Sequence, residues 1–167
     1  MNISEIIAEL IKLQPLFNLG VLGSVSDGKS TLVRTISGIR TQKSKEEKKK
    51  NITINAGYAN FKIYKLNEEY NDNNLNEYVL GIDLKEEEKK YYDLVNHLSF
   101  IDCPGHMGLI LTMLSNIKLM NGVIIVVSAS DNINEKPQLI QHLAAVKLSK
   151  IKNIIVCFNK IDLVNKD

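Results

Sequence analysis

The sequence contains few features of membrane, secreted or metal-rich proteins. Only two cysteines occur, Cys103 and Cys157, each within or beside an apolar run. Two cysteines form no metal-ligand cluster, and they favour a reducing, intracellular setting. No apolar run approaches the length that spans a bilayer, so no membrane partner is expected. Residues 1–5 have neither the basic start nor the apolar core of a secretory signal. We therefore expect a cytoplasmic protein.

The overall composition is that of an ordinary globular protein. The chain has 167 residues, of which 44% are hydrophobic and 24% charged, and its formal net charge is +2. This length suits one domain with a sizeable core. A net charge so close to zero does not favour a protein that binds nucleic acid through its overall positive charge. No internal repeats and no second domain are evident, so residues 1–167 are predicted to form one domain.

A phosphate-binding loop is predicted between Gly23 and Ser30, whose sequence fits G-x-x-x-x-G-K-[ST]. An apolar run precedes it and an apparent helix start follows it, so several backbone N–H groups could turn inward around a phosphate. Lys29 would reach the β- and γ-phosphates, and the Ser30 hydroxyl would ligate Mg²⁺. A turn that matches the pattern by chance is the alternative. The nucleotide-binding residues predicted here are Gly23, Val25, Ser26, Asp27, Gly28, Lys29, Ser30 and Thr31.

A second motif, Asp102-Cys103-Pro104-Gly105-His106, follows directly on a strand. The carboxyl ends of strands face the ligand crevice in open α/β sheets, so Asp102 is predicted to hold Mg²⁺ through a water molecule. The Gly105 N–H could meet a γ-phosphate because no side chain intervenes. His106 would lie near the attacking water as the catalytic residue. The alternative for His106 is a residue at a helix start that faces solvent.

The third motif is Asn159-Lys160-Ile161-Asp162, also at a strand end. The Asp162 carboxylate could accept hydrogen bonds from both N1–H and the exocyclic amino group of guanine, which adenine cannot supply. A wrong base would leave buried polar groups unpaired, so such a match discriminates strongly. Asn159 would hold the base edge and the loop, while the Lys160 stem lies along the base. The three motifs in this order predict a GTP site.

Strands and helices alternate along most of the chain. This order predicts an α/β fold with a doubly wound, mainly parallel sheet. An amphipathic helix, residues 3–11, comes first and is expected to pack on the domain. The other expected elements are strands at 17–22, 58–64, 98–101, 122–127 and 153–158 and helices at 29–37, 108–118 and 137–148. The strands at 122–127 and 153–158 are continuous apolar runs, which are typical of buried strands.

Two segments break this alternation. Residues 39–56 include a polar, lysine-rich stretch, for which we consider a solvated linker or a first switch loop that orders on nucleotide binding. Thr53, near its end, is a candidate Mg²⁺ ligand, with a residue that begins a strand as the alternative. Residues 66–92 are rich in Asn, Glu and Lys and have little to bury, so we expect an exposed, irregular insertion.

With these motifs in order, the chain resembles the translational GTPases, and most closely the gamma-subunit family of eukaryotic and archaeal initiation factor 2. The likeness runs from about residue 17 to 164. It is carried by Lys29-Ser30-Thr31, Ile36-Ser37-Gly38, Asn51-Ile52-Thr53-Ile54, Gly57-Tyr58-Ala59-Asn60, His97-Leu98-Ser99-Phe100, the 102–106 motif, Pro137-Gln138, His142-Leu143-Ala144-Ala145 and Asn159-Lys160-Ile161-Asp162-Leu163-Val164.

The resemblance implies a GTPase of the P-loop fold that binds GTP or GDP with Mg²⁺. In its GTP state this family carries methionyl initiator tRNA to the small ribosomal subunit, in a trimer with alpha and beta subunits. The resemblance implies that Ser30 and Thr53 ligate Mg²⁺, that Asp102 acts through water, and that His106 positions the hydrolytic water. It also implies that hydrolysis is slow without partners.

Three departures from the family pattern change these expectations. The family usually has histidines where this chain has Ser24 and Asp27, and Asp27 should weaken phosphate binding unless it turns to solvent or assists a cation. Residues 66–90 contain no cysteine, so the family's zinc knuckle is not expected. The chain stops at Asp167, so we expect a G domain truncated before its last strand and helix.

Three other functions remain open at this point. An elongation factor of the Tu or selenocysteine type belongs to the same class. A docking module that keeps the fold but hydrolyses little or no GTP is favoured by Ser24 and Asp27. An ATP-dependent kinase would bind ATP as well as GTP.

Overall fold

The computed structural model describes residues 2–42, 53, 55–70, 75–105 and 110–164. Helices and strands alternate as the sequence predicts, except over residues 57–102, where three strands follow one another. They are α1 (Ile3–Leu13), β1 (Phe17–Leu22), α2 (Lys29–Ser37), β2 (Gly57–Leu66), β3 (Tyr78–Gly81), β4 (Tyr92–Asp102), α4 (Ile110–Ile117), β5 (Gly122–Ser128), α5 (Pro137–Leu148) and β6 (Asn153–Asn159), with short 3-10 helices at Ile133–Glu135 and Ile161–Leu163.

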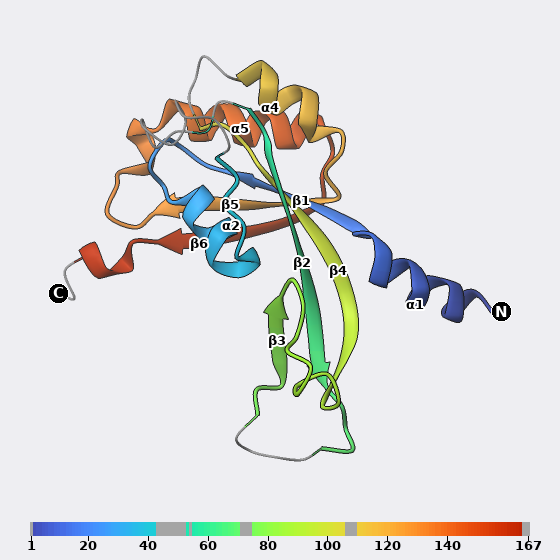
Figure 1. The fold of residues 1–167 in the computed structure, drawn as a ribbon. Helices are drawn as coiled ribbons and strands as arrows, with labels where there is room; N and C mark the ends of the chain where they lie inside the picture. The colour runs from blue at the N-terminus through green and yellow to red at the C-terminus, as the bar shows by residue number, and fades with distance from the viewer. Residues whose placement is uncertain (1, 43–52, 54, 71–74, 106–109, 165–167) are drawn as a thin grey trace.

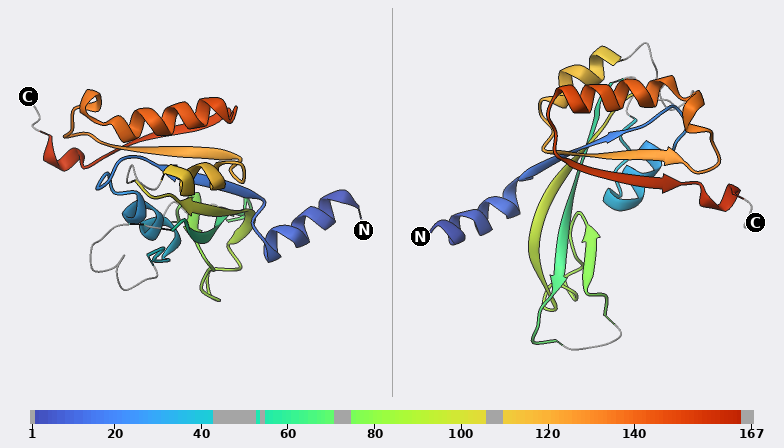
Figure 2. Two further views of the ribbon diagram at one scale, coloured as in Figure 1. Left: turned by 90° about the horizontal axis from the view of Figure 1, so that it is seen from above. Right: turned by 180° about the vertical axis from the view of Figure 1, so that it is seen from behind.

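The six strands form one sheet in the order β3-β2-β4-β1-β5-β6. The pairs β4–β1, β1–β5 and β5–β6 are parallel, whereas β2 runs antiparallel to both β3 and β4. Helix α2 lies on one side of this curled sheet, and α4 and α5 lie on the other (Figure 1, Figure 2). The fold is therefore a doubly wound α/β fold with a mainly parallel sheet, which confirms the predicted class.

The two helical layers bury two separate sets of apolar side chains. Val33 of α2 packs with one set, which includes Val21 of β1 and Phe100 of β4. Phe100 also stacks on Phe61 of β2, with ring centroids 4.3 Å apart. On the opposite face, Met113 of α4 and Leu139 of α5 pack with the other set. Burial of both faces explains why β5 is a continuous apolar run, and all seven of its residues are buried.

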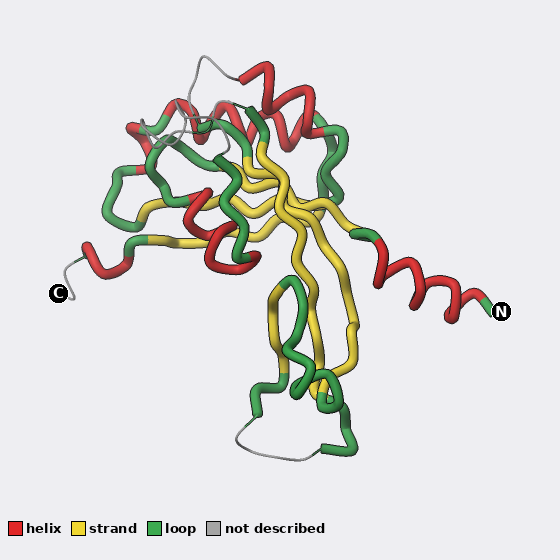
Figure 3. The backbone as a smooth tube through the Cα atoms, viewed as in Figure 1, coloured by secondary structure: helices red, strands yellow, loops and turns green. Residues whose placement is uncertain are grey.

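The long strands β2 and β4 extend beyond the helical layers and carry β3 at their far end (Figure 3). The irregular insertion expected at residues 66–92 is only partly irregular, because Tyr78–Gly81 forms β3 and pairs with β2. Leu84 and Tyr92 also form a small apolar cluster with Tyr64. The hydrophobic side chains here are too widely spaced in sequence to predict this cluster.

Two expectations of burial were wrong. β6 was predicted to be a buried strand, yet Ile155 is 58% and Phe158 61% exposed. In the described part of the chain, β6 pairs with β5 alone, at the edge of the sheet. Helix α1 was expected to pack on the domain, but it projects away from the sheet and buries no residue (Figure 1). None of the helices in the described residues has both the length and the apolar character needed to span a bilayer.

Candidate nucleotide-binding site

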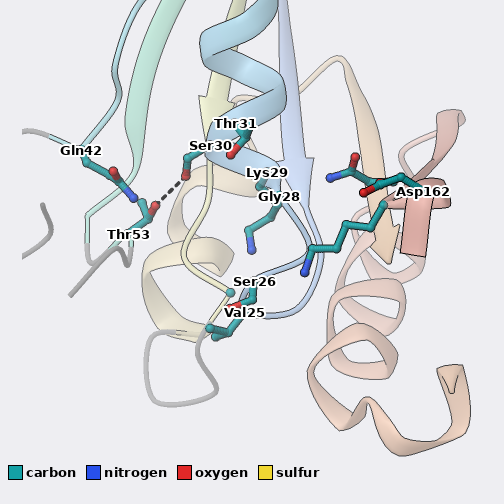
Figure 4. Close-up of a pocket in the computed structure, with 12 residues that line it drawn as sticks. Val25, Ser26, Gly28, Lys29, Ser30, Thr31, Gln42, Thr53 and Asp162 are labelled. Atoms are coloured by element: carbon teal, nitrogen blue, oxygen red, sulfur yellow. Dashed lines mark hydrogen bonds between the residues drawn. The ribbon is translucent and has the colours of Figure 1, made fainter. Parts of the chain in front are cut away.

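A pocket lies at the carboxyl ends of the parallel strands. The loops after β1, β4 and β6 meet there, since Val21 of β1 aligns with Asp102 of β4 and the β5–β6 register ends at Asn159. Residues from segment 39–56 complete the wall. The pocket has a volume of about 480 Å³ and is lined by Val25, Ser26, Gly28, Lys29, Ser30, Thr31, Gln42, Thr53, Gly105, Asn159, Lys160 and Asp162 (Figure 4).

Most of the residues predicted from the three motifs thus share one pocket. Three predicted binding or metal residues do not line it, namely Gly23, Asp27 and Asp102. His106, the predicted catalytic residue, lies outside the described residues. Gln42 lines the pocket and was not predicted. It lies in a polar stretch without a recognisable pattern, so no sequence signal distinguished it from its neighbours.

The phosphate loop has the backbone shape that its glycines predict. Gly28 has φ +96°, and a Cβ atom there would lie 2.1 Å from the Asn159 Nδ2 atom. Ser26 and Lys160 also line the pocket and have positive φ, although neither is glycine. Such conformations are strained for side-chain-bearing residues and are concentrated at functional sites. Helix α2 then begins at Lys29, so its first N–H groups face the pocket region.

Lys29 is buried, and its Nζ atom donates a 2.7 Å hydrogen bond to the Ser24 carbonyl oxygen. Burial lowers the pKa of Lys29 below its usual value, while the negative charges of Asp102 and Asp27 act in the opposite direction. A lysine held in this way presents its ammonium group to the phosphate loop with little rotamer freedom.

Ser30 and Thr53 point toward each other across the pocket, with 3.1 Å between their hydroxyl oxygens (Figure 4). Two neighbouring ligands of an octahedral Mg²⁺ at about 2.1 Å would be separated by roughly 3.0 Å. The hydroxyl pair therefore fits the spacing and the oxygen chemistry of a Mg²⁺ site. No group of three His, Cys, Asp or Glu side chains among the described residues could hold a metal. The expectation of no zinc stays a prediction.

Asp102 is fully buried at the end of β4, behind the pocket wall. Its Oδ2 atom accepts a 2.6 Å hydrogen bond from the hydroxyl group of Thr41, which is itself buried. Thr41 thus ties segment 39–56 to the second motif. Gly105 lines the pocket, where a Cβ atom would lie 2.5 Å from the Lys29 Nζ atom and 2.9 Å from the Val25 backbone nitrogen. Only glycine allows this close approach.

Asp27 is fully buried, away from the pocket lining. One carboxylate oxygen accepts a 2.8 Å hydrogen bond from the Ser24 N–H, and the other forms an ion pair with the Lys136 ammonium. The carboxylate therefore does not turn to solvent, as one expectation had it, but is neutralised by a buried ion pair with a lysine. The partner is a lysine at the start of α5, a residue that no motif indicated.

The predicted guanine motif, residues 159–162, lies at the end of β6. The Asn159 side chain donates a 2.8 Å hydrogen bond to the Asp27 carbonyl oxygen, which links this motif to the phosphate loop. Asp162 lies in the 3-10 helix that follows, with an exposed side chain that lines the pocket. Because this carboxylate is exposed to solvent at the edge of the pocket, it could accept hydrogen bonds from a ligand.

The chain is similar to known proteins over most of its length. Residues 14–167 match the family described as the elongation factor Tu GTP binding domain. The chain is 40% identical over 171 residues to the eukaryotic translation initiation factor 2 subunit gamma of Encephalitozoon cuniculi (strain GB-M1), covering 95% of the chain and 37% of that protein. Thus it spans little more than a third of this relative's length.

A solved structure gives the same result for the fold. The chain is similar to the bacterial selenocysteine-specific elongation factor EF-Sec, with a TM-score of 0.65 and 29% identity over 92% of this chain and 21% of that one. The family match covers most of the chain and includes all three motifs. The chain therefore belongs to the translational GTPases and contains a GTP-binding domain of the elongation factor Tu type.

Proposed function

We propose that this chain is the G domain of an initiation factor 2 gamma subunit, which binds GTP and hydrolyses it slowly without its partners. One observation carries the proposal: a single pocket contains Lys29, the Ser30–Thr53 hydroxyl pair, Gly105 and the Asn159–Asp162 loop. These groups have the chemistry to bind phosphates, Mg²⁺ and a guanine base in that order along one ligand. The 40% identity to a gamma subunit supports the choice of factor.

In this proposal, Lys29 and the N–H groups of the phosphate loop stabilise the charge on the phosphates. Ser30 and Thr53 would hold Mg²⁺, and Asp102, which does not line the pocket, would support it only through water. When bound, Mg²⁺ neutralises charge on the β- and γ-phosphates. Gly105 donates its N–H to the γ-phosphate, and His106 positions the attacking water. Loss of the γ-phosphate releases Thr53 and Gly105, so a conformational change is the output.

Base selection gives the sharpest test of the proposal. The Asp162 carboxylate accepts from the guanine amino group, whereas the amide of Asp162→Asn would donate to the 2-oxo group of xanthine. We expect the wild type to bind GTP, but not ATP or XTP, and the variant to prefer XTP. Asp93→Asn, which changes another exposed carboxylate outside the pocket, should keep the preference for GTP. ATP binding as tight as GTP binding would contradict the proposal and favour a kinase.

The cellular role follows from the gamma-subunit relative. We propose that the chain acts in the cytoplasm with initiation factor 2 alpha and beta subunits and delivers methionyl initiator tRNA to the small ribosomal subunit. An elongation factor of the selenocysteine type is the nearest alternative. The structural similarity to EF-Sec is the observation that supports it. Filter binding with GTP, the partner subunits and either initiator or elongator tRNA separates the two roles.

A docking module with little hydrolysis is the second candidate. Ser24 and Asp27 favour it, but the Asp27 carboxylate has a cationic partner in Lys136. Single-turnover hydrolysis of GTP, with partner subunits and ribosomes present, distinguishes the two. We expect His106→Ala to reduce the rate at least about a hundredfold, as for loss of a group that orients the nucleophile. Equal, negligible rates in wild type and variant would support the docking module.

A further inference from the structure

The start of helix α5 makes direct contact with the back of the phosphate loop. Lys136, the residue before Pro137, is 8% exposed and pairs through its ammonium with Asp27 of the loop. The same ammonium lies 2.8 Å from the Asp131 carboxylate. Asp131 in turn accepts a 2.9 Å hydrogen bond from Ser130. The loop after β5 thus holds Lys136 in place, with its charge directed at Asp27.

Asp27 needs such a partner for two reasons. A fully buried carboxylate without a counter-charge is strongly destabilising. In this chain the carboxylate also belongs to the loop that must receive phosphates, where an uncompensated negative charge would repel the ligand. Burial lowers the pKa of Lys136, but the hydrogen bonds and charges of Asp131 and Asp27 raise it above its usual value, so the lysine stays protonated.

Lys136 does not line the nucleotide pocket, so it has no place among the groups that touch the phosphates. Its effect on the ligand must pass through Asp27. That carboxylate also accepts from the Ser24 N–H, and Ser24 in turn accepts from Lys29. A change at Lys136 would therefore alter both the charge of the loop and the position of the lysine that contacts the phosphates.

We propose that Lys136 is a positioning residue that cancels the Asp27 charge and so allows the phosphate loop to bind the polyphosphate of a nucleotide. The inference rests on the proposed GTP site. It assigns a function to a lysine far outside the three motifs, 109 residues from its partner. It also explains how this chain tolerates an acidic residue in its phosphate loop.

The test measures the affinity of Lys136→Met for guanosine, GMP, GDP and GTP with Mg²⁺ by calorimetric titration. Loss of the charge pair should weaken GDP and GTP binding at least about tenfold, as expected for one unscreened charge interaction. Guanosine should change less than about threefold because it carries no phosphate, and GMP, with one phosphate, should change less than GDP and GTP. Lys147→Met, which removes an exposed lysine from the same helix, should bind all four ligands as the wild type does.

Removal of the acidic partner should reverse the effect. Asp27→Asn keeps an oxygen that accepts from the Ser24 N–H, and we expect it to bind GTP at least as tightly as the wild type. Adding Asp27→Asn to Lys136→Met should restore most of the lost GTP affinity, and Lys136→Arg should retain it. The single variant Asp27→Asn keeps the test informative if Lys136→Met does not fold.

The outcomes separate the two proposals. Equal weakening of all four ligands by Lys136→Met would mean a purely structural role and would overturn the inference. Unchanged GDP and GTP binding, or failure of Asp27→Asn to restore affinity in the double variant, would overturn it as well. If the wild type binds no guanine nucleotide, the proposed GTP site itself is wrong, which is a distinct result.

Discussion

Asn159 donates its side-chain amide to the backbone carbonyl oxygen of Asp27 over 2.8 Å. The bond joins the guanine motif to the phosphate loop, although the two residues are 132 positions apart in sequence. Gly28 makes this approach possible, because a Cβ atom there would lie 2.1 Å from the same amide nitrogen. The two ends of the proposed ligand site are therefore in direct contact.

The Ser30–Thr53 hydroxyl pair leads to a prediction about magnesium. Ser30→Ala removes one of the two hydroxyl oxygens that lie 3.1 Å apart. Mg²⁺ should therefore increase the affinity for GDP and GTP by a smaller factor than it does in the wild type. Substitution of residues that only hydrogen-bond to a metal ligand weakens metal affinity by about 10–100-fold. Loss of a ligand itself should therefore lower the affinity for Mg²⁺ at least about tenfold. Titrations with Mg²⁺ and with EDTA measure this effect.

Thr35→Ala is the matched control for that experiment, since it removes an exposed hydroxyl from the same helix. It should keep the wild-type dependence on Mg²⁺. If Ser30→Ala and the wild type lose the same affinity when Mg²⁺ is removed, the hydroxyl pair is not the metal site.

Gly105 leads to a prediction about the γ-phosphate. In Gly105→Ala the new methyl group would lie 2.9 Å from two backbone atoms of the phosphate loop, so the 103–105 loop must move away from the pocket. GTP binding should weaken roughly tenfold or more relative to GDP, the effect expected from one hydrogen bond to a charged group. Competition titrations with both nucleotides give the ratio.

The Gly81→Ala variant makes the same substitution where the nearest atom is 3.9 Å away, and it should leave the ratio unchanged. Equal loss of GTP and GDP affinity in Gly105→Ala would point instead to distortion of the phosphate loop.

His142 should make the stability of the chain depend on pH. It is 2% exposed, and its Nδ1 atom accepts a hydrogen bond from the Gly23 N–H. Burial, and then the charge of Lys29, lower its pKa from 6.5 to about 4, while Asp27 acts in the opposite direction. From pH 6.5 down to about 4 the unfolded chain gains this proton and the folded chain does not. The free energy of unfolding should therefore fall through that range, by up to about 3 kcal/mol.

Urea unfolding of the wild type and of His142→Gln between pH 4.5 and 7.5 isolates this contribution. The glutamine can accept the same hydrogen bond but does not titrate, so its stability should fall less with acidification. Parallel curves for the two proteins would show that His142 titrates alike in the folded and unfolded states.

The two cysteines should differ in reactivity. Cys103 is fully buried, and burial, followed by the Asp102 charge, raises its pKa from 9.0 to about 12. Its thiolate fraction near pH 8 is thus roughly a thousandfold below that of an ordinary thiol, and alkylation in the folded state should be correspondingly slow. Cys157 is half-buried and should label first.

Mass spectrometry of the chain after timed treatment with iodoacetamide assigns the label to each cysteine. Both should react after denaturation in urea, which serves as the control. Early labelling of Cys103 in the folded chain would contradict the burial of this strand end.

Local patterns were sufficient for much of the fold. The apolar run at Phe17–Leu22, the helix that ends at Gly38 and the helix that begins at Pro137 all lie where the sequence predicts them. These elements follow from short-range spacing, from glycine conformation and from the geometry of proline. The three motifs, read in order, also led to one shared pocket.

Contacts between distant segments required the folded structure. The Asp27–Lys136 ion pair, the Thr41–Asp102 hydrogen bond and the place of Gln42 in the pocket have no signal in any local pattern. The exposure of β6 likewise depends on its place at the sheet edge, since an apolar run has the same appearance whether or not a neighbour covers it. The reason is physical: backbone shape is set largely by neighbouring residues, whereas a side chain's partners and burial are set by whatever the whole chain packs beside it.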